Sequence, residues 1–126
     1  MRSKLIKSID KDAFAQVLQH AWSLASSTKW TQANPASGQC GVTALVAQDV
    51  LGGDILKTKY GDIWHFYNRI EGEVIDFTKS QFEAPIGYDN RLATRAEAFA
   101  DTNAEQYNHL STAVQKHLDT TNHKRN

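Results

Sequence analysis

The chain has 126 residues, of which 40% are hydrophobic and 22% charged, and we expect residues 1–126 to form one domain. Fourteen basic side chains balance fourteen acidic ones, so no excess of positive charge points to nucleic acid as a partner. No apolar run approaches the roughly 18 residues of a membrane span, and the single cysteine cannot form an internal disulfide. We therefore expect a cytoplasmic protein without a membrane span, whose oligomeric state the sequence does not indicate.

Two helices are predicted in the first half of the chain. Apolar residues at three- and four-residue steps predict a helix over 10–30 that begins at Asp10 as its N-cap. Residues 31–39 form a loop, because Asn, Pro, Ser and Gly gather there. The next helix runs from Cys40 to Leu51 and is apolar on almost every side, so we expect it to be buried.

The second half of the chain predicts strands and then helices. Strand-like runs at 54–60, 63–70 and 73–78 are separated by two short turns, which predicts an antiparallel meander. Residues 79–92 are expected to be a loop. Two capping-box patterns, which begin at Thr94 and Thr102, then each open a helix. The expected fold class is α+β, with the buried helix packed on a small antiparallel sheet and further helices around it.

The cysteine, one histidine and one aspartate form a candidate catalytic group. Cys40 opens the buried helix, where the helix dipole and a nearby imidazolium would favour the thiolate. If Ile70 lies opposite Glu73 across a two-residue turn, His65 and Asp76 are diagonal neighbours on one face of the sheet, within hydrogen-bond reach. We expect this shared face to lie under the helix that starts at Cys40.

These three residues would have distinct roles in acyl chemistry. Cys40 would be the nucleophile, His65 the general base and acid, and Asp76 the residue that orients the imidazole. The backbone N–H of Cys40 is one candidate oxyanion donor, and a side-chain amide from the preceding loop is expected to be the second. The candidates for that amide are Gln39, Gln32 and Asn34.

Two further residues are candidates for substrate binding. Tyr67 and Arg69 lie on the same predicted face as His65, so they could line a substrate site. Asn68 projects to the opposite face and is expected to be structural. Each residue of the catalytic group also has an ordinary structural explanation, since lone cysteines are often core residues. No paired spacing of metal ligands is present, so we expect neither a metal nor another cofactor.

The motifs resemble a known enzyme core and a known family. Gly-x-Cys at a helix start, His-x-aromatic-Asn on a strand and Asp-x-Thr on the next strand are similar to the transglutaminase-like core, which is also papain-like. More specifically, the chain resembles the small bacterial YunG family over most of its length. That resemblance includes Trp22-Ser23-Leu24, Lys29-Trp30, Asn34-Pro35, residues 38–45, Leu51-Gly52-Gly53, residues 65–69, residues 75–78, Gln81-Phe82 and residues 101–107. The enzyme resemblance implies a papain-like domain with a Cys-His-Asp triad, whereas the YunG resemblance implies no established activity.

These observations favour a cysteine-dependent hydrolase, either a peptidase or an amidase, that works through a thioester. Its substrate would be a protein, a peptide or a small amide. Acyl transfer, as in a transglutaminase, and deamidation would use the same triad with a different acceptor. Two non-enzymatic alternatives stay open: a binding module on the same fold, and a redox-sensing thiol, although the chain offers no resolving cysteine.

Overall fold

The computed structural model describes residues 10–125, with side chains through residue 119. The helices are α2 (Lys11–Ala21), α3 (Cys40–Leu51), α4 (Arg95–Ala100) and α5 (Ala104–Arg125), with a short 3-10 helix, η1 (Lys79–Gln81). The strands are β1 (Asp54–Tyr60), β2 (Ile63–Ile70), β3 (Glu73–Ile75) and β4 (Arg91–Ala93). They form one antiparallel sheet in the order β3-β2-β1-β4. The α+β class predicted from the sequence is confirmed.

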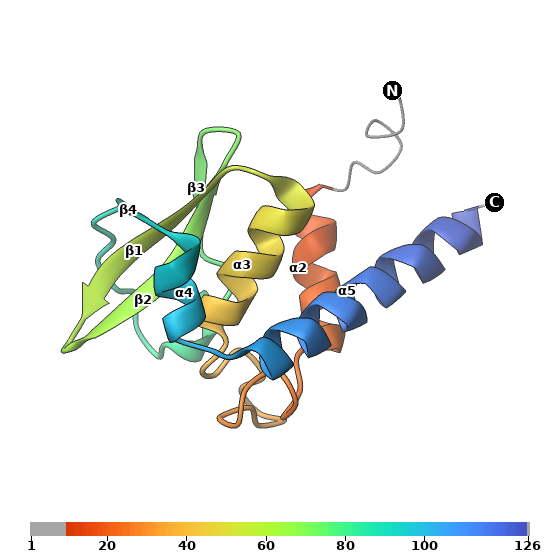
Figure 1. Ribbon diagram of the computed structural model, residues 1–126, viewed down its shortest axis with the longest axis horizontal. Helices are drawn as coiled ribbons and strands as arrows, with labels where there is room; N and C mark the ends of the chain where they lie inside the picture. The colour runs from red at the N-terminus through yellow and green to blue at the C-terminus, as the bar shows by residue number, and fades with distance from the viewer. Residues whose placement is uncertain (1–9, 126) are drawn as a thin grey trace.

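Helix α3 lies between the sheet and the pair formed by α2 and α5 (Figure 1). Its side toward α2 and α5 packs in a core that includes Val42, Val46 and Leu110. Its other side packs in a second core with Ile55 and Phe66 of the sheet, and with α4. Because neighbours cover it on both sides, the uniformly apolar sequence of α3 is what this position requires.

The first helix is shorter than the sequence predicts. Asp10 is the N-cap as expected, and its carboxylate accepts a hydrogen bond from Ala13 N at 2.7 Å. The helix ends at Ala21, however, because Trp22 adopts extended backbone and donates its indole N–H to Thr43 Oγ1 on α3 at 2.9 Å. The serines that follow bond to nearby backbone groups in turns, which competes with helical hydrogen bonding.

The predicted hairpin register between β2 and β3 is confirmed. Ile70 pairs with Glu73 across a two-residue turn, and both turn residues, Glu71 and Gly72, have positive φ. This backbone is that of a type I′ turn, which matches the twist of a two-residue hairpin. Strand β3 ends at Ile75 rather than at residue 78, because the chain turns away at residue 76.

Three other expectations are corrected. Residues 79–92 are not only a loop, since they contain η1 and the start of β4, which pairs with β1. The last helix is capped by Asn103 instead of Thr102: Asn103 Oδ1 accepts from Gln106 N at 2.8 Å. The face of β2 that contacts α3 is also the opposite one from our expectation, because Asn68 Nδ2 donates to the Ala44 carbonyl at 3.1 Å.

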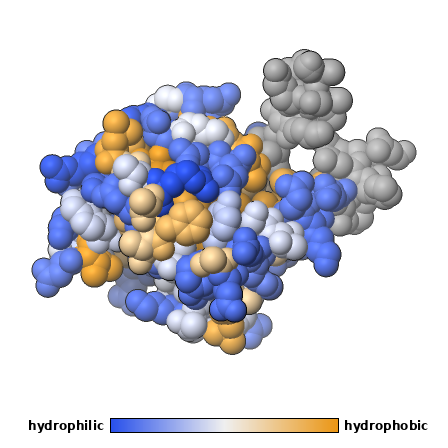
Figure 2. Space-filling view, in the orientation of Figure 1, coloured by the Kyte–Doolittle hydropathy of each residue, from blue (hydrophilic) through white to orange (hydrophobic). Residues whose placement is uncertain are grey.

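Among the described residues, no helix is long and apolar enough to span a bilayer. Figure 2 shows hydrophilic residues over this face of the molecule, with apolar residues in patches between them. The most exposed large apolar side chains, Leu24, Ile63 and Leu92, come from three separate segments.

The turn between α3 and β1 requires a residue without a side chain at position 53. Gly53 has φ of +81°, and a Cβ there would lie 2.1 Å from the carbonyl oxygen of Arg69. We predict that Gly53→Ala lowers the free energy of unfolding by about 3 kcal/mol or more, because left-handed strain adds to a backbone clash. Gly61→Ala is the control, since Gly61 has φ of +62° and open space around it. Urea denaturation of both variants checks this, and equal losses would contradict it.

Candidate active site

Cys40 lies at the N-terminus of α3 and contacts a carboxylate from α4. Its Sγ donates to Asp101 Oδ2 at 3.4 Å, and the backbone N–H of Gly41 donates to the same oxygen at 3.0 Å. Asp101 is the C-cap residue of α4, so the end of one helix meets the start of another. Gly41 allows this approach, because a Cβ at that position would lie 2.5 Å from Asp101 Oδ2.

His65 and Asp76 form a buried pair. His65 Nε2 lies 2.7 Å from Asp76 Oδ2, and the two side chains are 2% and 4% exposed. Asp76 also accepts from Tyr88 OH at 2.7 Å and from Thr78 N and Oγ1 at 3.1 and 3.2 Å. With four hydrogen bonds, the Asp76 carboxylate is held in place and fixes the imidazole in turn. The predicted hydrogen-bond contact between His65 and Asp76 is therefore present, although Asp76 lies one residue beyond β3.

Packing also holds the imidazole. Phe82 contacts the His65 ring edge to face, with centroids 4.9 Å apart, and Tyr67 stacks against it at 5.8 Å. These aromatic rings lie on the side of the sheet away from α3. Because a carboxylate only accepts hydrogen bonds, Nε2 carries the proton toward Asp76. The lone pair of Nδ1 is then available to another partner.

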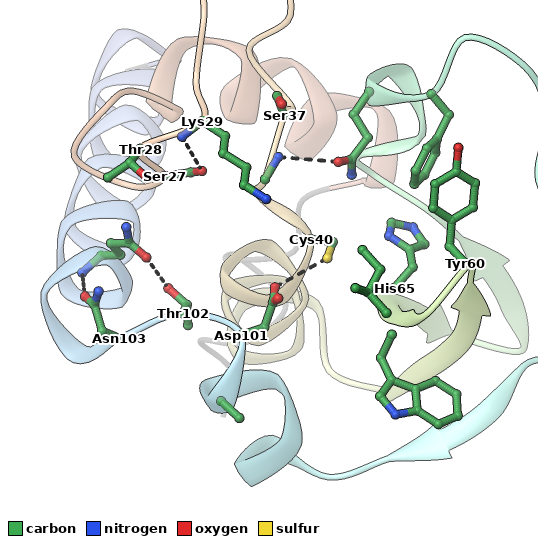
Figure 3. Close-up of a pocket in the computed structure, with 17 residues that line it drawn as sticks. Ser27, Thr28, Lys29, Ser37, Cys40, Tyr60, His65, Asp101, Thr102 and Asn103 are labelled. Atoms are coloured by element: carbon green, nitrogen blue, oxygen red, sulfur yellow. Dashed lines mark hydrogen bonds between the residues drawn. The ribbon is translucent and has the colours of Figure 1, made fainter.

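Cys40 and His65 line one cavity of about 400 Å³. In Figure 3 the sulfur lies between Asp101 on one side and His65 on the other. The short length of β3 makes this meeting possible. In β2, the N–H groups of every second residue, Ile70, Asn68 and Phe66, point toward the edge on which β3 lies. Strand β3, however, ends opposite Asn68. The N–H of Phe66 is therefore free to face the sulfur of Cys40.

The surroundings of Cys40 favour the neutral thiol. Burial, followed by the negative charge of Asp101, raises the pKa of the thiol to about 12, although the Phe66 N–H acts in the opposite direction. This corrects the expectation that the helix terminus and an imidazolium lower the thiol pKa. The helix dipole stabilises a thiolate by on the order of 1 kcal/mol, whereas a carboxylate in contact with the sulfur destabilises it.

Comparison with known proteins places the chain in a family. The family described as YunG protein matches residues 10–119. The chain belongs to the YunG family. It is 54% identical over 103 residues to a protein of Bacillus subtilis (strain 168) described as "Uncharacterized protein YunG". The matched region covers 82% of this chain and 90% of that protein. No solved structure matches the chain.

The side-chain amides proposed as oxyanion donors do not line the cavity of this YunG-family protein. Gln39 is fully buried and donates to the carbonyl of Pro35 at 3.3 Å. Asn34 donates to the carbonyl of Gln81, and Gln32 is exposed at the surface. The side-chain amides of Gln39 and Asn34 are therefore already engaged with backbone carbonyls. The backbone N–H of Cys40, at the first turn of α3, has no acceptor within the helix.

The two predicted substrate-binding residues also lie outside the cavity lining. Tyr67 is buried, and its hydroxyl is hydrogen-bonded to both Oδ1 and the backbone N–H of Asn90. Arg69 pairs with Asp54, its partner across the β1–β2 ladder, at 3.5 Å. The contribution of Tyr67 to the site is its stacking contact with the His65 ring.

Sequence reasoning missed Asp101 and Tyr88. Asp101 follows a capped helix and lies 61 positions from Cys40, so no local pattern links the two. Tyr88 belongs to a stretch predicted as a loop, and its hydroxyl reaches Asp76. Because of partial burial and then of that bond, the pKa of Tyr88 is raised, so its hydroxyl keeps its proton and donates it. The described residues contain no cluster of three or more His, Cys, Asp or Glu side chains that could hold a metal ion.

The thiol of Cys40 should react slowly in the free protein. With a pKa near 12, we expect iodoacetamide to alkylate it at pH 8 roughly 10- to 100-fold more slowly than free cysteine, with a rate that still rises above pH 10. Mass spectrometry follows the reaction cleanly, because the chain has one cysteine. The urea-unfolded chain is the control and should react at the ordinary rate. A plateau below pH 8.5 in the folded protein would show a thiolate instead.

The bond between His65 and Asp76 should be visible by proton NMR. We expect the Nε2 proton of His65 to appear as a downfield resonance protected from solvent exchange, because it is buried and donated to a carboxylate. The resonance should disappear in Asp76→Ala. His20, which is exposed, supplies the internal reference for a rapidly exchanging ring proton. A proton found on Nδ1 instead would mean that the ring is oriented differently.

Proposed function

We propose that this YunG-family protein is a cysteine-dependent hydrolase of amide or related acyl bonds. Cys40 is the nucleophile, His65 the general base and acid, and Asp76 the residue that orients His65. One observation carries the proposal: the 2.7 Å bond from His65 Nε2 to Asp76. It leaves Nδ1 as the basic nitrogen of a ring that shares a cavity with the thiol.

The proposed reaction begins from a neutral thiol. As the sulfur attacks the carbonyl carbon, the thiol proton passes to His65 Nδ1, so no free thiolate has to accumulate. The carbon–sulfur bond forms, and the carbonyl π electrons move to oxygen. When the tetrahedral intermediate collapses, the imidazolium returns the proton to the leaving amine and a thioester remains on Cys40. Water then attacks the thioester with His65 as its base, which releases the acid and restores the thiol.

The N-terminus of α3 supplies the oxyanion donors in this proposal. The backbone N–H of Cys40 lies beside the reacting sulfur, and the positive end of the helix dipole favours negative charge there. The N–H of Gly41 points in the same direction, since it already binds a carboxylate oxygen at 3.0 Å. Because these donors belong to the backbone of a buried helix, they are fixed before substrate binds.

The order of the three residues along the chain supports a proposed relationship to a papain-like or transglutaminase-like core. A papain-like or transglutaminase-like core has its nucleophile at the start of a buried helix, with histidine and aspartate delivered in that order by an antiparallel sheet. The order along this chain is the same, from α3 to β2 to the turn after β3. A cavity of about 400 Å³ suits one amino-acid side chain or a small amide more than a folded protein surface.

A non-catalytic binding module is the second candidate, and the raised pKa of Cys40 favours it. In that case the thiol would only be a polar atom of a pocket, and His65 would only be a packed side chain. Acyl transfer and deamidation remain variants of the first proposal, because they differ from it only in the acceptor or the leaving group.

An acylation experiment separates these functions. We expect p-nitrophenyl acetate to acylate Cys40, as seen by mass spectrometry of the intact protein, and His65→Ala to slow acylation about 10²–10⁴-fold through loss of the base. Cys40→Ala should abolish the adduct. His20→Ala is the matched control and should leave the rate unchanged, since His20 is exposed on α2. Decay of the adduct in water, with or without an added amine, separates hydrolysis from acyl transfer. Equal acylation rates in wild type and His65→Ala would contradict the proposal.

A further inference from the structure

Asp101 contacts the candidate nucleophile from the side opposite His65. One carboxylate oxygen, Oδ2, accepts from Cys40 Sγ at 3.4 Å and from Gly41 N at 3.0 Å. Figure 3 shows the thiol directed to Asp101, with His65 across the cavity. In this geometry the thiol proton is donated away from the imidazole that would have to remove it.

The contact is built into the fold. Helix α4 is fixed by its capping box at Thr94 and by Ala98, which is fully buried against α3 and the sheet. The end of α4 therefore meets Gly41, and a Cβ at residue 41 would overlap Asp101 Oδ2 and approach the Ala98 carbonyl to 2.9 Å. Absence of a side chain at residue 41 is thus what allows the carboxylate to reach the helix start.

Asp101 also occupies the place where a reacting carbonyl oxygen would be stabilised. Its Oδ2 is an anion on a backbone N–H at the N-terminus of α3, within contact distance of the sulfur. A tetrahedral intermediate on Cys40 would put its own oxyanion on donors of this helix end. The two anions would compete for the same region, so the carboxylate has to leave or lose its charge for acylation to proceed.

We propose that Asp101 is a positioning residue that holds Cys40 as a protonated thiol turned away from His65, and that its displacement or protonation prepares the nucleophile. The catalytic consequence rests on the proposed function, but the hold on the thiol does not require His65 to be a base. Asp101 can be displaced, since the residue is exposed to solvent on its outer side. Asp76, in contrast, is buried and held by four hydrogen bonds.

Several charged or titratable groups surround this contact. His65 faces Cys40 from β2, Asp76 lies behind His65, and Tyr60 lines the cavity from β1. Lys29 lines the cavity from the loop before α3. Partial burial raises the pKa of Asp101, whereas its bonds to Cys40 and Gly41 and the positive charge of Lys29 act in the opposite direction. Among the described residues, Asp101 is the acidic group that is hydrogen-bonded to the sulfur, so its removal should have a larger effect on the thiol than removal of another carboxylate.

The test compares pH titrations of the thiol, read by its ultraviolet thiolate absorbance and by iodoacetamide alkylation. We expect Asp101→Asn to move both profiles to lower pH by about one unit or more, which is a tenfold change in the thiolate equilibrium. Asparagine can still accept from Gly41 N, so a merely structural role would leave the profile unchanged. Asp12→Asn is the control for net charge, because Asp12 is exposed on α2.

A second variant keeps the test independent of the first. Gly41→Ala should displace Asp101 and shift the thiol profile in the same direction, while urea denaturation reports whether each variant is folded. An unshifted profile in folded Asp101→Asn or Gly41→Ala would overturn the proposal. The outcome is separate from that of the acylation experiment: if His65→Ala acylates normally but Asp101→Asn shifts the thiol, the catalytic proposal fails and the hold on Cys40 stands.

Discussion

The burial of α3 between the sheet and the α2–α5 pair is the constraint on which the rest of the structure depends. The helix has apolar contacts on both sides, so it cannot rotate or slide without opening one core or the other. Its first residue is therefore fixed relative to β2 and to the end of α4. A cysteine there has a defined set of neighbours, and those neighbours decide its chemistry more than the helix terminus does.

The site also depends on where β3 stops. Asp76 turns the chain by accepting two hydrogen bonds from Thr78, and the same carboxylate binds His65. If β3 had continued along β2, its backbone would have covered the edge at which Cys40 approaches Phe66. One side chain thus ends the strand, opens the edge and orients the imidazole.

The parts that the sequence predicted correctly are those decided locally. The N-cap at Asp10, the start of α3 at Cys40 and the pairing of Ile70 with Glu73 each depend on a few adjacent residues. The face of β2 that packs on α3 was predicted wrongly, because period-two alternation says which residues share a face but not which face meets a helix. Asp101 and β4 were missed because distant contacts alone place them.

The two carboxylates of the site differ in a way that bears on its chemistry. Asp76 is buried and saturated with hydrogen bonds, so it can stabilise an imidazolium but cannot move without breaking the turn that it closes. Asp101 makes two contacts and is open to solvent, so its displacement costs little structure. A negative charge next to a thiol opposes ionisation, whereas one behind an imidazole stabilises its protonated form. With Asp101 in place, both the proton and the sulfur are directed away from His65. If Asp101 is displaced, as we propose, the helix terminus, the Phe66 N–H and His65 would all favour transfer of that proton. If our proposals hold, the same set of residues supports both an unreactive thiol and a reactive one, and the position of one exposed carboxylate distinguishes them.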